Sequence, residues 1–485
     1  MKNTVSKGFV YYLFLLASIV CGVACIFGAI LLFSPGTSLF GIKYINHNLE
    51  SQFLYEDIYD DQSAMLDTLI TEGKITTINF VTDYVDFNIE NEDVVSMRII
   101  VAARISGFAN AENKDKFTVE AEFNEEAKSY TFKCFGPQCN VILFSENAKI
   151  TFALPLSAKT QNLQINYITE TGNIVAGKKI KDDYTIRALH VESSNNSLVE
   201  IGNKLNITEN LDLDVQKGEI VLNTNITDKL GNITPSIDVD RVKIKTNDAK
   251  IEIQSIKADE FKLISEASSI KIGSVDGAFE YDAYRGVIIV GTITGKFSCS
   301  ERVEISNIQI DKCYGEVLLP KANTSNITIG EAFSNCSIVT DSGNVTINKC
   351  RGYAYVETNT GKIEITQVSD KVTQTEGLLR TLTVISHKSG DIKINFEDVV
   401  GLNEIKANDN GDITINFTKQ ANFILEYNCN EKAPTLSTGI DPNPAQKVNT
   451  YYRGDTNTTN RIKISNNKGN TKIEDTLIVQ KNTAN

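Results

Sequence analysis

Ser342-Gly-Asn-Val-Thr-Ile347 and Thr360-Gly-Lys-Ile-Glu-Ile365 are two copies of one short pattern, and this pattern decides the fold. Each copy opens on turn-forming residues and continues with two apolar residues separated by one position. Alternate side chains of a strand point to opposite faces, so the two apolar side chains of a copy share one face. Glycine, serine and aspartate before them suit a tight turn. Each copy is therefore predicted to be a turn followed by a short strand.

The pattern recurs through the middle of the chain at steps of about nine to eleven residues. A unit of this size cannot bury its own apolar face, whereas stacked units bury theirs against one another. Outlying copies begin at Gly172, Gly218, Gly390, Gly411 and Gly469. The uninterrupted copies begin at Asp240, Ala249, Asp259, Ser268, Gly277, Gly286, Gly295, Ser306, Gly315, Ser325, Ser334, Gly343, Gly352 and Gly361.

These repeats predict an all-β fold, a right-handed parallel β-helix or β-solenoid. A coil of two copies would contain about 18–20 residues, with like strands of successive coils about 4.8 Å apart. The apolar pairs, such as Val345 with Ile347 and Ile363 with Ile365, are predicted to face the core.

Phe9 to Phe33 form an apolar run without a charged residue. About 20 apolar residues suffice for a helix to cross a bilayer. A cleaved signal peptide typically has a shorter apolar core, of about 7–15 residues. Lys2 and Lys7 precede the run, and basic flanks favour the cytoplasmic side. The sequence thus predicts an uncleaved, single-pass signal-anchor in the plasma membrane, with the bulk of the chain outside the cell.

The remaining sequence shows period-two alternation before the repeats and irregular, proline-containing sequence after Gly411. Val85, Phe87 and Ile89 indicate a strand of a cap, and Met65, Leu66, Leu69 and Ile70 have the spacing of a short helix. The predicted parts are a cytoplasmic stub (1–8), a transmembrane helix (9–33), a neck (34–73), a β-rich N-terminal cap (74–160), β-solenoid repeats (161–420), a C-terminal cap (421–476) and a tail (477–485).

The composition excludes several classes of function. The net charge is −13, which would repel the phosphates of a nucleic acid. The sequence contains no phosphate loop, dinucleotide fingerprint or serine elbow, and its three histidines have no nucleophile nearby in sequence. We therefore predict no nucleic-acid partner, no cofactor, no metal and no enzymatic activity.

The motifs Ile150-Thr-Phe-Ala-Leu-Pro155 and Thr171-Gly-Asn-Ile174, together with the copies at Gly343, Gly361 and Gly390, resemble the bacterial putative-adhesin repeat family. Members of that family are membrane-anchored β-solenoids, mostly of unassigned role. The resemblance covers about residues 74–417 and implies a solenoid fold and a role in adhesion. The long neck and the number of cysteines depart from the family pattern.

Six of the nine cysteines form two groups. Cys134 and Cys139 flank a predicted turn and form either a small disulfide hairpin or two thiols in an oxidising exterior. Cys299 and Cys336 fall on inward positions and Cys313 and Cys350 in turns, so the spacing does not suit a disulfide between them. These four are predicted to be buried free thiols.

Two further sets of side chains invite a functional interpretation. Asp391 and Asp412 follow equivalent glycines one coil apart. Their carboxylates could have the spacing that a retaining glycosidase uses. Solvated aspartates in turns are the simpler explanation. Tyr353 and Tyr355 occupy outward positions, near Tyr314 in a turn, and are candidate surface contacts for a sugar or a protein.

The leading hypothesis is a cell-surface β-solenoid that displays a repetitive face for adhesion or protein–protein interaction. One alternative is an extracellular enzyme acting on polysaccharide, and another is an envelope signalling or stress component. The partners predicted are the membrane, through residues 9–33, and an unidentified surface or protein ligand.

Overall fold

The structure is a computed structural model. It describes residues 7–33, 38–39, 42–53, 69–70, 72–83, 85–92, 98–110, 118–136, 141–155, 160–178, 180, 183–223, 225–227, 233–235, 237–300, 303–368, 380–418, 421–429, 432–437, 439–442, 449–455 and 457–475. The chain divides into two compact units, Met1–Ile174 with Lys179–Asp182, and Val175–Lys178 with Asp183–Asn485.

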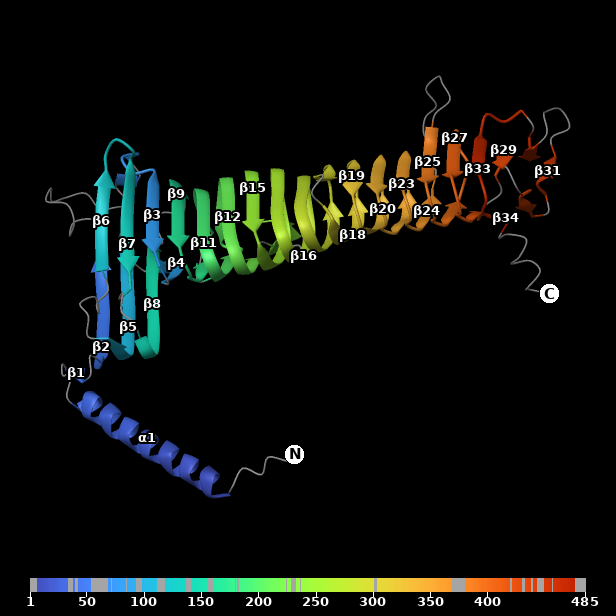
Figure 1. The fold of residues 1–485 in the computed structure, drawn as a ribbon. Helices are drawn as coiled ribbons and strands as arrows, with labels where there is room; N and C mark the ends of the chain where they lie inside the picture. The colour runs from blue at the N-terminus through green and yellow to red at the C-terminus, as the bar shows by residue number, and fades with distance from the viewer. Residues whose placement is uncertain are drawn as a thin grey trace. The chain divides into compact units, whose positions relative to one another are not determined.

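The first unit contains one long helix and a set of strands (Figure 1). Its elements are α1 (Lys7–Phe33), β1 (Ser38–Leu39), β2 (Ile42–Phe53), β3 (Thr77–Thr82), β4 (Asp86–Glu92), β5 (Arg98–Asn110), β6 (Thr118–Asn124), β7 (Ser129–Phe135), β8 (Val141–Pro155) and β9 (Thr160–Thr169), while β10 (Ile174–Ala176) lies where the units divide. Among the residues that the structure describes, none of the helices meets the length and apolar character needed to cross a membrane.

Strands of the first unit pair in both senses. Strand β3 lies parallel between β7 and β9, and β4 pairs parallel with β8. Strands β2, β5 and β8 pair antiparallel in that order. Val85, Phe87 and Ile89 are almost completely buried, which confirms the alternation predicted from the sequence.

The segment predicted as a neck contains an element that the sequence analysis missed. Residues Ile42–Phe53 form β2, which pairs over its length with β5. Of the predicted short helix, Leu69 and Ile70 are helical and buried, whereas Met65 and Leu66 lie outside the described residues.

The second unit contains the repeats. Its strands are β11 (Tyr184–Gly202), β12 (Leu205–Asn223), β13 (Asn225–Thr227), β14 (Ile233–Pro235), β15 (Asp238–Thr246), β16 (Asp248–Ile293), β17 (Phe297–Cys299), β18 (Ile305–Cys313), β19 (Val317–Ala322), β20 (Asn326–Ala332), β21 (Cys336–Thr340), β22 (Val345–Cys350), β23 (Ala354–Thr358), β24 (Ile363–Gln367), β25 (Arg380–Ser386), β26 (Ile392–Phe396), β27 (Leu402–Ala407), β28 (Ile413–Phe417), β29 (Phe423–Cys429), β30 (Thr435–Leu436), β31 (Asp441–Pro442), β32 (Thr450–Arg453), β33 (Arg461–Asn466) and β34 (Thr471–Asp475).

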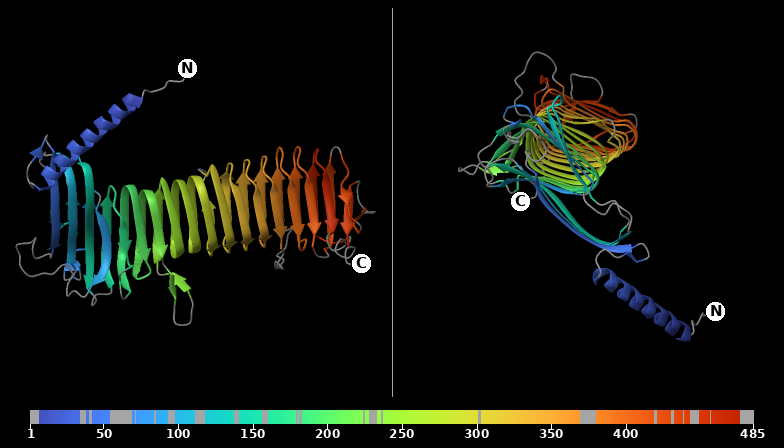
Figure 2. Two further views of the ribbon diagram at one scale, coloured as in Figure 1. Left: turned by 90° about the horizontal axis from the view of Figure 1, so that it is seen from below. Right: turned by 90° about the vertical axis from the view of Figure 1, so that its left-hand side faces the viewer.

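From β17 to β28 the strands alternate between two parallel ladders, and the coils are stacked one on the next (Figure 2). One ladder runs β17–β19–β21–β23–β25–β27 and the other β18–β20–β22–β24–β26–β28. Equivalent positions are 20 residues apart from Phe297 to Val317, 19 from Val317 to Cys336 and 18 from Cys336 to Ala354. The parallel stacking is therefore confirmed, and so is the predicted length of these coils, whereas the coil from Ile363 to Ile392 is longer, at 29 residues.

Apolar pairs of the repeat fill the core between the two ladders. Val345, Ile347, Ile363 and Ile365 each have 0% exposure, as the sequence predicted. Burying such a side chain stabilises the fold by about 1.5–3 kcal/mol before entropy is counted. The core of the stack is therefore continuous from one coil to the next.

Strand β16 differs from the predicted series of short strands, since it continues for 46 residues through several copies of the repeat. Backbone bonding to the preceding coil continues at its bends: Lys257 donates to the carbonyl of Ile237, and Ala267 to that of Asn247. The turn residues therefore bend the strand without ending it.

The last coil departs from chain order. Strand β33 lies parallel between β27 and β29, and β34 between β28 and β30, although β29 and β30 come earlier in the sequence. Strand β32 pairs antiparallel with β29, and β31 with β32. After β28 the chain thus skips one coil position and forms a terminal layer with β29 and β30. It then returns, and β33 and β34 fill the skipped position.

Candidate functional site

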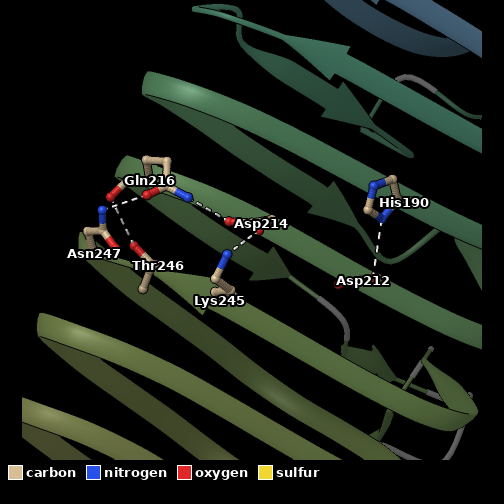
Figure 3. A network of polar contacts seen from close by, with 7 residues as sticks. All are labelled: His190, Asp212, Asp214, Gln216, Lys245, Thr246 and Asn247. Atoms are coloured by element: carbon tan, nitrogen blue, oxygen red, sulfur yellow. Dashed lines mark hydrogen bonds and ion pairs between the residues drawn. The ribbon is translucent and has the colours of Figure 1, made fainter.

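A row of charged side chains covers the outward face of β11, β12 and β15 (Figure 3). The register places His190 opposite Asp212, and Asp214 opposite Lys245. His190 Nδ1 lies 3.4 Å from Asp212 Oδ2, and Lys245 Nζ lies 2.7 Å from Asp214 Oδ2. Side chains on adjacent coils are thus paired by opposite charge across about 4.8 Å of coil spacing.

The pairing shifts the titration of its members. The hydrogen bond to Asp212 raises the pKa of His190, against the opposing effect of burial. The same hydrogen bond holds the pKa of Asp212 below its usual value. Lys245 also has a raised pKa, because Asp214 accepts its hydrogen bond. Folding therefore favours the charged form of all three groups.

Amide side chains extend this row toward the end of the strands. Gln216 Nε2 donates to Asp214 Oδ1 at 2.8 Å, and Asn247 Nδ2 donates to Gln216 Oε1 at 2.5 Å. The hydroxyl of Thr246 donates to the carbonyl of Gln216 at 3.4 Å (Figure 3). Asp214, Gln216, Lys245, Thr246 and Asn247 therefore form a connected polar network, beside the separate pair of His190 and Asp212.

Opposite charges face each other at other outward positions of the stack as well. Exposed pairs of this kind contribute about 0–1 kcal/mol each, so they add little to the core. The pairs are Lys250 with Glu219, Lys257 with Asp238, Lys262 with Glu280, Arg351 with Glu331, and Lys393 with Glu364.

The predicted surface contacts lie at the beginning of β23: Tyr353 directly precedes the strand and Tyr355 is its second residue. Both are half-buried. The hydroxyl of Tyr353 donates to Thr383 Oγ1 at 3.3 Å, and that of Tyr355 donates to Glu357. Glu357 Oε1 lies 2.6 Å from His387 Nε2. The two tyrosines thus belong to a polar cluster that spans β23 and β25.

Within this cluster the hydrogen bond between Tyr355 and Glu357 dominates the titration. It raises the pKa of Tyr355 to about 12 and holds the pKa of Glu357 below its usual value. His387 Nδ1 is within 3.2 Å of Asn408 Nδ2, which donates when that nitrogen is unprotonated. Sequence analysis missed Glu357 and His387, which are 30 residues apart and meet only through the coil register.

Asp391 and Asp412 serve the turns of the stack. Asp391 Oδ1 accepts the backbone N–H of Asp412 at 3.1 Å, and Asp412 Oδ1 accepts that of Asn470 at 2.7 Å. In the same way, Asn326 Oδ1 accepts the backbone N–H of Asn344, and Asn344 Oδ1 accepts that of Lys362. The two carboxylates therefore occupy the position of structural turn residues, which agrees with the simpler interpretation of the sequence.

The four cysteines of the repeats are free thiols, as predicted, but two were placed wrongly. Cys313 and Cys350 end β18 and β22 and are completely buried, whereas the sequence predicted them in turns. Each thiol donates to the carbonyl two residues later, Gly315 and Gly352, at 3.4 Å. That contact orients each side chain inward at the strand end.

Burial also changes the acidity of these thiols. It raises the pKa of Cys313 to about 11 and that of Cys350 to about 12, and raises those of Cys299 and Cys336 well above the ordinary value. Such thiols are poor nucleophiles. Cys134 is buried on β7, and its predicted partner Cys139 lies outside the described residues, so that pairing stays a prediction.

Metal ligation finds no support among the side chains that the structure describes, because no three His, Cys, Asp or Glu residues gather there with suitable geometry. The segment around Asp409 and Asp412 instead forms ordinary turn contacts. Lys468 Nζ lies 2.7 Å from Asp409 Oδ1.

The two-strand coils with a continuous apolar core define a parallel β-solenoid. Residues 282–474 match the family model described as Toastrack DUF4097. The predicted resemblance to an adhesin-like repeat family is thereby confirmed. No curated protein matches the chain.

Solved structures with some likeness include a putative cell adhesion protein from Clostridium sporogenes, at 9% identity and a TM-score of 0.16, covering 88% of this chain and 100% of that one. A putative adhesin from Parabacteroides merdae shows 11% identity and a TM-score of 0.21, covering 66% of this chain and 96% of that one. A putative adhesin from Parabacteroides distasonis shows 9% identity and a TM-score of 0.16, covering 88% and 97%. At such TM-scores these likenesses carry no argument about this chain.

Proposed function

We propose that the protein is a cell-surface β-solenoid that binds other proteins or surfaces through the outward face of its coils. In this proposal residues 9–33 anchor it in the plasma membrane, the N-terminus is cytoplasmic and the bulk of the chain is extracellular. The coils wind in the right-handed sense, and the protein acts as a binding scaffold without catalysis.

The division of labour between the two faces of each strand supports this proposal. On β23, Ala354 and Val356 are completely buried, whereas the alternate residues Tyr355 and Glu357 face outward and are partly exposed. The inward positions hold the stack together, so the outward positions can vary without loss of the fold. Repeated coils therefore supply a long surface on which several weak contacts can act together.

Tyr353 and Tyr355 are proposed contacts on that surface, because aromatic side chains combine a large apolar area with a polar group. The division into stub, helix, neck, caps and repeats, and the disulfide between Cys134 and Cys139, remain parts of the same proposal. An oxidising exterior would favour that disulfide.

Protease treatment of intact cells that express the full chain tests the location. We expect an external protease to remove the sequence after Phe33 and to leave a tag on the N-terminus intact. Full protection of the bulk of the chain from the protease would contradict the proposed topology.

Attachment of the same cells to immobilised proteins, extracellular matrix and host cells tests the function. Cells with the chain are expected to attach more strongly than cells without it, and Tyr353→Ala with Tyr355→Ala to attach less strongly. Equal attachment of both kinds of cell, with surface display verified, would overturn the proposed binding role.

A further inference from the structure

One corner of the stack carries a column of planar side chains, Tyr314, Phe333 and Arg351, in three successive coils. Each follows the second strand of its coil, after β18, β20 and β22. Their backbone N–H groups each donate at 2.9 Å to a carbonyl of the preceding coil, those of Ile293, Cys313 and Ala332. The column is therefore held in register by the backbone.

The side chains of this column stack on one another. The rings of Tyr314 and Phe333 are nearly parallel, at 14°, with centroids 4.3 Å apart. The guanidinium carbon of Arg351 lies 5.1 Å from the centroid of the Phe333 ring. Glu331 Oε1 accepts hydrogen bonds from Arg351 Nε at 2.8 Å and from Nη2 at 2.6 Å. The chain thus shows a guanidinium that stacks on the aromatic pair and is held by a carboxylate.

This column has a closed end at Arg351 and an open end at Tyr314. Tyr314 is 47% exposed. Among the described residues outside α1, the other large apolar side chains that are exposed are Val287 and Ile289. The preceding coil places Thr294 in the column, a short side chain that cannot cover a tyrosine ring. Phe333 covers one face of the Tyr314 ring, so the exposure of this residue falls on the ring edge and on the second face.

A carboxylate lies beyond that open face. The hydroxyl of Thr294 donates to Asp276 Oδ1 at 2.5 Å, so the carboxylate lies beside Thr294 on the side of the column away from Tyr314. Lys312, two residues before Tyr314, lies opposite Glu331 in the register, which supplies an opposite charge for it. The open end therefore offers an aromatic face and, one coil beyond Thr294, the carboxylate of Asp276.

We propose that the exposed face of Tyr314, with Asp276, is a docking site for a guanidinium group, supplied by an arginine side chain of a partner protein. This inference rests on the proposed function and names a contact chemistry for it. A guanidinium stacks on aromatic faces and is attracted to a carboxylate, so an arginine side chain can use both features. The acidic chain also attracts a basic partner over longer distances.

Binding of a fluorescent peptide with two arginines to the full chain in detergent micelles, followed by anisotropy, tests the proposal. Tyr314→Ala keeps the net charge but removes the ring, and is expected to weaken binding by about two- to five-fold. Tyr314→Phe keeps the face and is expected to bind as the parent does. Asp276→Asn should weaken binding, while Val287→Ala, the matched control on a neighbouring coil, should leave it unchanged.

Three results would overturn the site. If Tyr314→Ala binds the peptide as tightly as the parent, only net charge attracts the peptide. If the two-arginine peptide and its two-lysine counterpart bind equally and Tyr314→Ala weakens neither, the stacking geometry has no role. If the parent binds a glycan array and Tyr314→Ala does not, with binding of the peptide unaffected, the ring is assigned to a sugar instead. In each case, cell attachment that persists would leave the proposed function in place.

Discussion

Replacing Gly343 by alanine should separate two coils of the solenoid. A Cβ atom at this position would lie 1.5 Å from the carbonyl oxygen of Ser325 in the preceding coil, where ordinary contacts begin at 3.4 Å. The glycines of later coils have the same restriction: the Cβ of an alanine at position 361 would lie 1.9 Å from the carbonyl oxygen of Gly343. The obstructing atoms are backbone atoms, so no side chain can rotate away.

The cost follows from the hydrogen bonds near this contact. Relieving it requires a shift on the order of 2 Å, which is enough to break hydrogen bonds of ordinary length. Ile327 N donates to Asn344 O at 2.8 Å, and Asn344 N donates to Asn326 Oδ1 at 3.1 Å. Two or three lost bonds cost about 1 kcal/mol each, whereas alanine recovers only about 0.4–1 kcal/mol of chain entropy. A net loss of about 2 kcal/mol is expected.

Urea unfolding of the full chain in micelles, followed by circular dichroism, measures this loss, and hydrogen exchange of peptides from β21 to β24 locates it. The exchange should accelerate around the substituted turn and much less at distant coils, since each coil contacts its neighbours. Ser342→Ala, at an adjacent exposed side chain, is the matched control. Unchanged urea midpoint and exchange for Gly343→Ala would refute the close approach of the turns.

Three further perturbations test other parts of the structure. Ile347→Ala should lower the unfolding free energy by about 2–5 kcal/mol, because Ile347 is completely buried. Thr346→Ala, on the outward face of the same strand, should change it little. Equal effects of the two substitutions would mean that Ile347 does not face the core. His190 has a raised pKa in the folded state, so its ion pair with Asp212 stabilises the fold fully below the unfolded pKa of about 6.5, and this contribution is lost as pH rises through the folded pKa. His190→Gln should therefore lose up to about 1 kcal/mol against the parent at pH 5.5 and nothing at pH 9, by thermal unfolding at each pH. The repeat thiols should react with iodoacetamide only after denaturation, as mass spectrometry would show; rapid labelling of the native chain would contradict their burial at Cys299, Cys313, Cys336 and Cys350.

Much of the core was predictable from local pattern. The spacing of Val345 and Ile347 after Gly343 predicted an inward pair and a turn, and the structure has both. The surface contacts were less accessible to prediction. The sequence indicated that Tyr353 and Tyr355 face outward. It did not predict the hydrogen bond between His387 and Glu357, because an insertion lengthens the coil between these two residues.

The sequence by itself determined the strand and turn period, the inward face and the length of the coil. These depend on side-chain alternation and turn chemistry, which act over a few residues. The tertiary structure alone decided that β2 pairs with β5, that β33 fills a position between β27 and β29, and that the ring of Tyr314 stacks on that of Phe333. Such contacts join residues far apart in the chain, and their register is set by the whole stack and not by any local pattern.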